Sequence, residues 1–329
     1  MWEVARKNQR KSIFLVIIMS IVLIGLGYLI GMAFNPEDGW FYGIMIATAI
    51  YFILLFIAFA QGKSIILRMS NAKEIQHKDN PMLYNIVEEM SLAAGMGKVP
   101  KVYIIDDPAP NAFAAGMTPD KSIVAVTSGL LNMMTRDELQ GVVAHEISHI
   151  INRDIRYLTI ATIMVASVAL ISQMFLRSML YSRGGGRSSG SGGGRGQAII
   201  MIVAVVFAIL APIVIQFLYF SLSRKREYLA DASGARLTRY PEGLASALEK
   251  IGGSTLDLKS ADQSTAPMYI ANPLKPKGQR LKNLSSTHPP LAERIKILRA
   301  MGGNSSLSDY QQAYKSVSGK KAGFIPKKG

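Results

Sequence analysis

Four long apolar segments constrain how this chain of 329 residues can fold. They occupy residues 13–34, 41–60, 158–176 and 198–220, and none of them contains Asp, Glu, Lys or Arg. A helix needs about 20 consecutive apolar residues to cross the hydrocarbon core of a bilayer. The pattern therefore predicts four membrane-spanning helices arranged as two hairpins, which we assign to residues 1–62 and 158–222.

The charges of the connecting loops orient the first hairpin. The segment before the first span carries several Lys and Arg residues, whereas the loop after it contains Glu37 and Asp38 and no basic residue. Because basic loops stay in the cytoplasm, both ends of this hairpin are expected there, in a multi-pass protein of the cell (inner) membrane. The loop of the second hairpin, residues 177–197, is itself basic, so the same rule does not orient it.

The net charge of +15 comes from 37 Lys and Arg residues against 22 Asp and Glu residues. Such a surplus can indicate a nucleic-acid partner or an anionic membrane surface. Here the basic residues flank the apolar spans, as is typical of proteins in contact with a lipid bilayer. The sequence contains no nucleic-acid-binding module, and it does not determine the oligomeric state.

Two polar blocks remain outside the spans, residues 63–157 and 223–316. Together they are large enough for one compact domain, which we expect on the cytoplasmic face with the second hairpin inserted into it. The Gly- and Ser-rich residues 182–196 have the composition of a flexible linker. Residues 317–329 are expected to form a flexible basic tail.

Periodicity and helix-start chemistry predict an α+β domain that is mainly helical and carries a small β-sheet. Thr135, followed three residues later by Glu138, is a capping box for a helix over residues 137–156. Short β-branched runs predict strands at residues 101–105 and 121–127. Further helices are predicted at residues 80–96, 222–238, 241–251 and 290–300, and a loop-like stretch at residues 256–284.

The motif that carries chemistry is the HExxH sequence formed by His145, Glu146 and His149. Residues four apart lie on one face of a helix, so both imidazoles can reach one cation while Glu146 reaches a water molecule beside it. The chain has no cysteine and only four histidines, which excludes thiolate sites. A pair of packed histidines is the alternative, and the spacing favours metal ligation.

A catalytic zinc site takes three protein ligands and keeps a fourth position open. Glu227 is the best candidate for the third ligand, because a helix places Asp231 one turn further on the same face, where it can bind a ligating imidazole. An isolated pair of this kind would instead indicate a solvated acidic stripe. However, His149 precedes the third span by about as many residues as Glu227 follows the fourth. A closed helical hairpin would therefore hold the two residues at the same distance from the membrane.

In this order the motifs resemble those of the HtpX-type membrane zinc metalloproteases, in the wider gluzincin-type family that includes the CAAX prenyl proteases. The similarity covers nearly the whole chain, beginning with the paired amino-terminal spans. The motifs that carry it lie at residues 110–116, 127–131, 145–149, 152–154, 227–231 and 288–290, with Glu293 and Arg294.

The resemblance implies one zinc ion per chain on His145, His149 and Glu227, with Glu146 as general base and Asp231 as the partner of a ligating imidazole. It also implies zinc-dependent endoproteolysis of misfolded or damaged membrane proteins on the cytoplasmic side, in membrane protein quality control and the stress response. The expected partners are therefore polypeptide substrates, mainly membrane proteins.

Four residues between the two predicted strands are candidate substrate contacts, because in related gluzincins the corresponding edge strand pairs with extended substrate. Backbone pairing suits a protease that accepts many sequences. An ordinary turn of small residues is an equal alternative. The four residues are Asn111, Ala112, Phe113 and Ala114.

Two residues near the carboxyl end are also candidates for the site. His288 could donate to the oxyanion of a tetrahedral intermediate, or it could cap or pack against the helix that follows it. Arg294 could pair with active-site carboxylates or with Asp154. The sequence leaves both choices open.

Three other functions fit parts of the pattern. A CAAX-type prenyl-protein protease shares the motifs, although that family usually has more than four spans. A non-enzymatic zinc-binding membrane protein would keep the ligands without cleavage. A zinc or proton transporter would need ionisable residues at membrane depth, and the four spans contain no acidic residue, no basic residue and no histidine.

Overall fold

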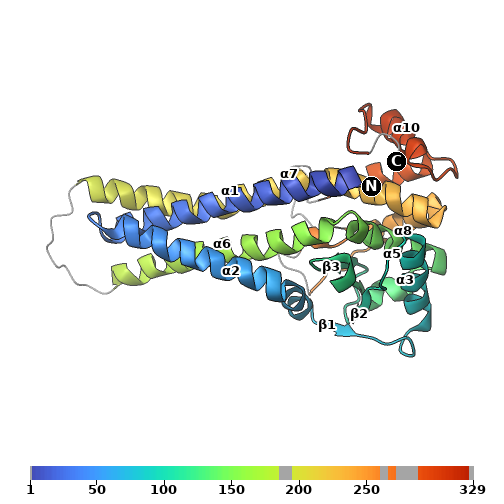
Figure 1. Cartoon of the computed structure of the whole chain (residues 1–329), viewed down its shortest axis with the longest axis horizontal. Helices are drawn as coiled ribbons and strands as arrows, with labels where there is room; N and C mark the ends of the chain where they lie inside the picture. The colour runs from blue at the N-terminus through green and yellow to red at the C-terminus, as the bar shows by residue number, and fades with distance from the viewer. Residues whose placement is uncertain (1, 185–194, 260–265, 272–287, 326–329) are drawn as a thin grey trace. The chain divides into compact units, whose positions relative to one another are not determined.

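The computed structural model of the chain describes residues 2–184, 195–259, 266–271 and 288–325 (Figure 1). Its helices are α1 (Trp2–Phe34), α2 (Gly39–Met69), α3 (Pro81–Ala93), α4 (Ser128–Met133), α5 (Arg136–Ile151), α6 (Asp154–Gly184), α7 (Arg195–Thr238), α8 (Pro241–Gly253), α9 (Leu291–Arg299) and α10 (Leu307–Ser318). Its strands are β1 (Ala72–Glu74), β2 (Lys101–Ile105), β3 (Ala112–Ala115) and β4 (Ile123–Thr127), with short 3-10 turns η1 (Pro119–Lys121) and η2 (Ala266–Met268). The described chain is thus mainly helical with one small sheet.

The chain divides into two compact units. The sheet-bearing unit comprises the residues up to Arg10, then Gln61–Thr159, and the residues from Phe220 onward. The helical unit comprises Lys11–Ala60 and Ile160–Tyr219. Segments far apart in the sequence therefore build one domain around the sheet, and most of the residues that were expected to carry chemistry belong to it.

Two described stretches, Val16–Phe34 and Gly39–Met69, are long and apolar enough to cross a membrane by length and composition. Four spans were expected. In the described parts of α6 and α7 the corresponding apolar stretches are shorter, at Ser167–Arg177 and Ala198–Val214. Much of the linker expected at residues 182–196 lies outside the described residues.

The sheet has the strand order β1-β2-β4-β3 and is mixed. Strands β2 and β4 run parallel, while β1 and β3 pair antiparallel at the two edges. Every residue of β4 is buried, as is typical of a central strand that is covered on both faces. The predicted strand at residues 121–127 begins later, at Ile123, because Pro119 starts a 3-10 turn. Residues 112–115 form an edge strand rather than the turn that was the alternative.

The two faces of the sheet pack against different elements. On one face Val124 and Val126 join the core that α3, α5 and α8 share. On the other face Phe113 packs with Met268 and Tyr269. This arrangement fixes β3 between the HExxH helix and the segment that includes η2.

The predicted helix over residues 137–156 is interrupted. α5 ends at Ile151 and α6 begins at Asp154, because Arg153 adopts the left-handed region with a φ of 59°. This conformation costs a non-glycine residue about 1 kcal/mol. The break brings Asp154 Oδ2 within 3.2 Å of His149 Nδ1, so it supplies a side chain to the site.

Part of the segment that was expected to form a flexible basic tail, residues 317–329, contacts the rest of the chain within the described residues. α10 begins with a capping box of Ser306 and Asp309. After it, Ala322 and Ile325 are buried, and the ring of Phe324 stacks on Tyr228 with centroids 5.7 Å apart. Tyr228 follows Glu227 on α7, so this segment packs behind a candidate metal ligand.

Glu138 stabilises the helix that carries the HExxH sequence. It completes the capping box with Thr135, and its carboxylate accepts from Ser246 Oγ at 2.6 Å and Lys250 Nζ at 2.7 Å. We expect Glu138→Gln to lower the free energy of unfolding by about 1 kcal/mol, since a cap and a partly buried ion pair are weakened. Thermal unfolding of the purified protein measures this. Glu89→Gln, which removes an exposed ion pair with Arg136, is the matched control and should change little.

The effect of Glu138 should depend on pH. Burial alone would raise the pKa of Glu138, but Lys250, Ser246 and the Thr135 backbone outweigh it and lower the pKa below the usual 4.5. A carboxylate with a depressed folded-state pKa stabilises the fold above its unfolded pKa, and this contribution is lost as the pH falls through the folded value. The difference between wild type and Glu138→Gln should therefore be full near neutral pH and shrink below pH 4.5. A difference that grows on acidification would contradict this assignment.

Candidate metal centre

Small residues let α7 approach α5 closely enough for their side chains to share a site. A Cβ added at Gly234 would lie 3.2 Å from the backbone nitrogen of His145. The neighbouring Ala230 and Ala235 are fully buried. The helix with His145 and His149 therefore lies directly beside the helix with Glu227, although more than seventy residues separate them in the sequence.

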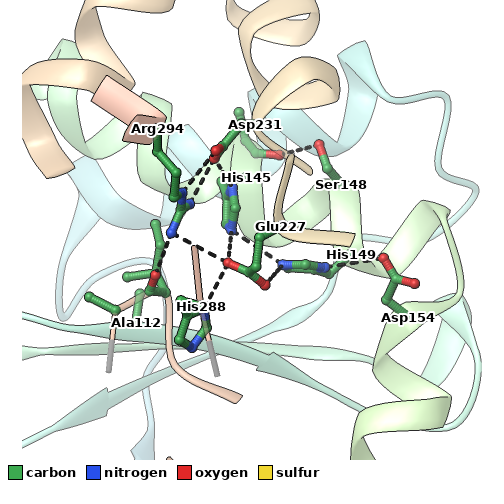
Figure 2. Close-up of polar contacts among 12 residues, drawn as sticks. Ala112, His145, Ser148, His149, Asp154, Glu227, Asp231, His288 and Arg294 are labelled. Carbon is green, nitrogen blue, oxygen red and sulfur yellow. Dashed lines mark hydrogen bonds and ion pairs between the residues drawn. The ribbon is translucent and has the colours of Figure 1, made fainter. Parts of the chain in front are cut away.

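Three buried side chains converge between these helices (Figure 2). His145 Nε2 and His149 Nε2 are 3.2 Å apart, and the Glu227 carboxylate oxygens lie 3.7 Å from the first and 3.4 Å from the second. Ligand atoms about 2.1 Å from a tetrahedral zinc ion lie roughly 3.4 Å from one another. The three side chains therefore have the spacing that zinc requires.

Each imidazole has a carboxylate behind it. His145 Nδ1 lies 3.0 Å from Asp231 Oδ1, and His149 Nδ1 lies 3.2 Å from Asp154 Oδ2. A proton held on Nδ1 by a carboxylate leaves the lone pair of Nε2 for a metal ion. Both Nε2 atoms point to the centre of the cluster, so each ring, when neutral with its proton on Nδ1, offers the Nε2 lone pair that ligation needs.

Arg294 and His288 hold the carboxylates of α7. Arg294 is fully buried, and its Nε and Nη2 donate to the two oxygens of Asp231 at 2.8 and 2.7 Å. Its Nη1 lies 3.4 Å from Glu227 Oε2, and His288 Nδ1 lies 2.9 Å from the same oxygen. Figure 2 shows both side chains directed at these carboxylates. Arg294 thus pairs with the carboxylates of α7, which was one of the two options left open.

The cluster carries an excess of negative charge that a divalent cation would neutralise. With neutral imidazoles, its buried carboxylates outnumber its buried guanidinium groups by two. The carboxylates are Glu146, Asp154, Glu227 and Asp231, and the guanidinium groups are Arg226 and Arg294. Buried charges require compensation, so a cation with two positive charges fits these residues.

The excess of buried carboxylates also shifts the pKa values of the two imidazoles. Burial would lower the pKa of His145 and of His149, but the surrounding carboxylates outweigh it. Asp231 and Glu227 raise the pKa of His145, and Asp154 and Glu227 raise the pKa of His149 to about 10. Protons on these rings thus compensate the carboxylates in the absence of a cation, and a metal ion has to displace them.

Glu146 has a different environment from Glu227. Burial raises the pKa of Glu146, and the neighbouring imidazoles only partly oppose this. Burial also acts on Glu227, but His288, His145 and His149 outweigh it and hold the pKa of Glu227 well below its usual value. Glu227 is therefore suited to remain an anion, whereas Glu146 is suited to gain and lose a proton.

The candidate substrate contacts lie along β3. Ala112, Phe113 and Ala114 are buried, and their strand packs against α5. The Asn111 side chain is engaged with the chain itself, because Nδ2 donates to Ala271 O at 3.1 Å. The side chain of Asn111, which directly precedes β3, therefore makes a structural contact with a residue 160 positions away, while β3 itself borders the candidate metal centre.

Two features of the site were not anticipated from the sequence. Asp154 was part of a motif at residues 152–154 and a candidate partner of Arg294, but it was not expected beside His149, where the break at Arg153 places it. Arg226, one of the basic residues that follow the fourth apolar segment, is buried, with its guanidinium carbon 3.7 Å from the centroid of the Tyr157 ring and Nε 4.0 Å from Asp154 Oδ1. A positive φ and a buried arginine leave no pattern in a single sequence.

We expect Asp154→Asn and Asp231→Asn each to weaken zinc binding about 10- to 100-fold, because an amide holds the Nδ1 proton less strongly than a carboxylate. Competition with a chromophoric chelator measures the zinc affinity. The exposed Asp257, replaced by Asn, is the matched control. Unchanged affinity in both site variants would contradict the orienting role of these carboxylates.

The candidate metal centre lies in the part of the chain that matches a known protein family. The profile of peptidase family M48 matches residues 77–302. A protein named "Protease HtpX homolog" from Dictyoglomus thermophilum is 44% identical over 94% of this chain and 97% of its own length. A protein of the same name from Listeria monocytogenes serotype 4b is 43% identical over 92% of this chain and 100% of its own length. Among solved structures, that of S. mikatae Ste24p covers 91% of this chain and 67% of its own, with 22% identity and a TM-score of 0.46.

Proposed function

Because this chain belongs to peptidase family M48, and is thus a membrane-associated metalloprotease, we propose that it cleaves misfolded or damaged membrane proteins on the cytoplasmic side of the membrane. The observation that carries the site assignment is the convergence of three buried side chains at the spacing of a tetrahedral zinc site. They are His145, His149 and Glu227.

In this proposal His145, His149 and Glu227 hold the zinc ion that the family implies. When bound, zinc polarises the scissile carbonyl and lowers the pKa of a water molecule. Asp231 and Asp154 keep the two imidazoles in the tautomer that binds, and Arg294 and His288 hold the Glu227 carboxylate by contacts of 3.4 and 2.9 Å. The oxyanion contact expected of His288 stays a prediction.

Glu146 is the proposed general base. It follows His145 on α5, and burial raises its pKa above the usual value, which favours a carboxylate that accepts a proton during the reaction. Its carboxylate takes a proton from the attacking water and delivers it to the nitrogen of the leaving amine. No covalent intermediate with the chain is needed, because water itself attacks the carbonyl.

The proposed anchor consists of four membrane-spanning helices, with the sheet-bearing unit in the cytoplasm. Two stretches of suitable length and composition support the first hairpin. The acidic loop after the first span and the basic segment before it support the cytoplasmic orientation. α6 and α7 are 31 and 44 residues long, which gives each of them enough helical length to cross a bilayer.

Cleavage assays with the full-length chain in liposomes test the function. We expect a destabilised membrane protein to be cleaved, cleavage to stop with a chelator, and stoichiometric zinc to restore it. The same protein in its stable form is the control and should be cleaved more slowly. Faster cleavage of a prenylated CAAX peptide than of the destabilised protein would favour the prenyl-protein protease instead, and chelator-resistant cleavage would exclude a metalloprotease.

A further inference from the structure

Arg226 is a buried cation that directly precedes the candidate ligand Glu227 on α7. Its side chain is 4% exposed, although Arg224 and Lys225, the two residues before it, are both more accessible to solvent. A guanidinium group leaves water only where neighbouring groups compensate its charge. Arg226 must therefore have partners inside the sheet-bearing unit.

Two residues at the start of α6 are these partners. The guanidinium carbon of Arg226 lies 3.7 Å from the centroid of the Tyr157 ring, and Arg226 Nε lies 4.0 Å from Asp154 Oδ1. Asp154 and Tyr157 are three residues apart, so they share a face of the helix. The ring provides a flat surface for the guanidinium group, and in a buried site a charge at this distance acts strongly on a carboxylate. Arg226 thus joins α7 to the first turn of α6.

The Asp154 carboxylate has a partner on each of its oxygens. Oδ2 lies 3.2 Å from His149 Nδ1 (Figure 2), and Oδ1 faces Arg226. Asp154 is fully buried, so neighbouring side chains determine how its carboxylate is turned. A rotation that moves Oδ1 away from Arg226 also moves Oδ2 away from the imidazole. Arg226 therefore helps to fix the direction in which Asp154 meets His149.

The other imidazole of the centre is supported by groups in the same order. His145 Nδ1 lies 3.0 Å from Asp231 Oδ1, and Arg294 donates to both oxygens of Asp231 at 2.8 and 2.7 Å. In both branches an imidazole is followed by a buried carboxylate and then by a buried guanidinium group. The contact of Arg226 with Asp154 is longer, at 4.0 Å. The shared order indicates that Arg226 supports the site as Arg294 does.

We propose that Arg226 is a positioning residue of the metal centre. Stacked on Tyr157, it holds the Asp154 carboxylate in the direction that His149 Nδ1 requires. Its effect on zinc affinity therefore passes through Asp154 and the imidazole. This inference rests on the zinc site of the proposed function, and it adds a residue that lies outside the motifs from which the ligands were predicted.

A double-mutant cycle on the full-length chain tests this path. Competition with a chromophoric chelator gives the zinc affinity of wild type, Arg226→Gln, Asp154→Asn and the double variant. We expect Arg226→Gln to weaken zinc binding about tenfold in the wild-type background. When Asp154 is already Asn, the same change should weaken zinc binding no further, because its path to His149 is gone.

The sign of the effect separates positioning from simple electrostatics. Removing a cation beside a metal site would by itself strengthen the binding of Zn²⁺, so weaker binding requires that Arg226 acts through another group. Unchanged or tighter binding in Arg226→Gln would overturn the inference, as would an equal loss in both backgrounds. Wild-type protein that binds no zinc would instead contradict the zinc site itself, and the inference with it.

Asp231→Asn provides the matched second cycle. Asp231 supports the other imidazole, so its effect and that of Arg226→Gln should multiply. Lys225→Gln removes an exposed positive charge next to Arg226 on α7 and should leave the zinc affinity unchanged. If Arg226→Gln also had no effect in the Asp231→Asn background, the substitution would loosen the whole site, and the inference would be overturned.

Arg226→Lys is the second variant, and it decides the question if the glutamine variant does not fold. Lysine keeps a positive charge near Asp154 but lacks the planar group that stacks on Tyr157. We expect it to weaken zinc binding about threefold when Asp154 is present, and not at all when Asp154 is Asn. An equal loss with and without the Asp154 carboxylate would overturn the inference.

Discussion

Replacing Glu146 by Gln is expected to lower kcat/KM about 10²- to 10⁴-fold while the purified protein keeps its zinc. Glutamine has nearly the shape of glutamate but cannot accept the proton of the attacking water. Because Glu146 is not among the three side chains that converge at metal-ligand spacing, its loss should not release the ion. Initial rates on an unfolded protein substrate, together with zinc content by mass spectrometry, measure both quantities.

Glu249→Gln is the matched control for this variant. Glu249 is an exposed residue of α8 that pairs with Arg299 at 2.8 Å, so the same chemical change at that position should leave both rate and zinc content unaltered. A Glu146→Gln protein that is loaded with zinc and cleaves at the wild-type rate would remove Glu146 from the role of general base.

Replacing Glu227 by Ala is expected to yield protein that lacks zinc and activity. The variant loses a candidate ligand, and it also leaves Arg294 and His288 beside a cavity without the carboxylate that both contact. Breaking a buried ion pair by removing one partner destabilises a protein by about 3 kcal/mol or more. The zinc content and the midpoint temperature of thermal unfolding should therefore both fall.

Glu227→Gln keeps the shape of the side chain, and it separates loss of ligation from loss of the fold. We expect this variant to fold like wild type but to bind zinc far more weakly. Glu242→Ala, an exposed residue that pairs with Arg299, controls for the change in charge. Wild-type zinc content in both Glu227 variants would show that the metal ion is held elsewhere.

The two halves of the candidate ligand set could each be predicted because each depends on local spacing, while the binding of a metal ion stays a prediction. His145 and His149 share a face of α5 through the four-residue interval, and Glu227 and Asp231 share a face of α7 in the same way. The central strands were also predictable, since their β-branched runs do not depend on distant contacts. Patterns of this kind can be read from a single sequence, because the spacing of residues close together in the chain determines which of them share a helix face or form a strand.

The remaining features depend on contacts between distant residues. Phe324 lies in a basic segment that indicates a flexible tail, and only the presence of Tyr228 and Tyr314 makes it part of the core. Similarly, nothing near Ile270 shows that its N–H pairs with Ala112. The conformation of Arg153 depends on how α5 and α6 are held, so a continuous helix was the natural expectation for residues 137–156.

Residues that support the candidate metal centre are synthesised well after the HExxH helix. Arg294 binds Asp231 and stands beside Glu227, and Phe324 packs behind the same helix. A nascent chain on the ribosome can expose the HExxH helix well before these residues emerge from the exit tunnel. We expect such a chain to have an incomplete site, so that hydrolytic activity arises only after Arg294 and Phe324 have been synthesised and have packed against α7.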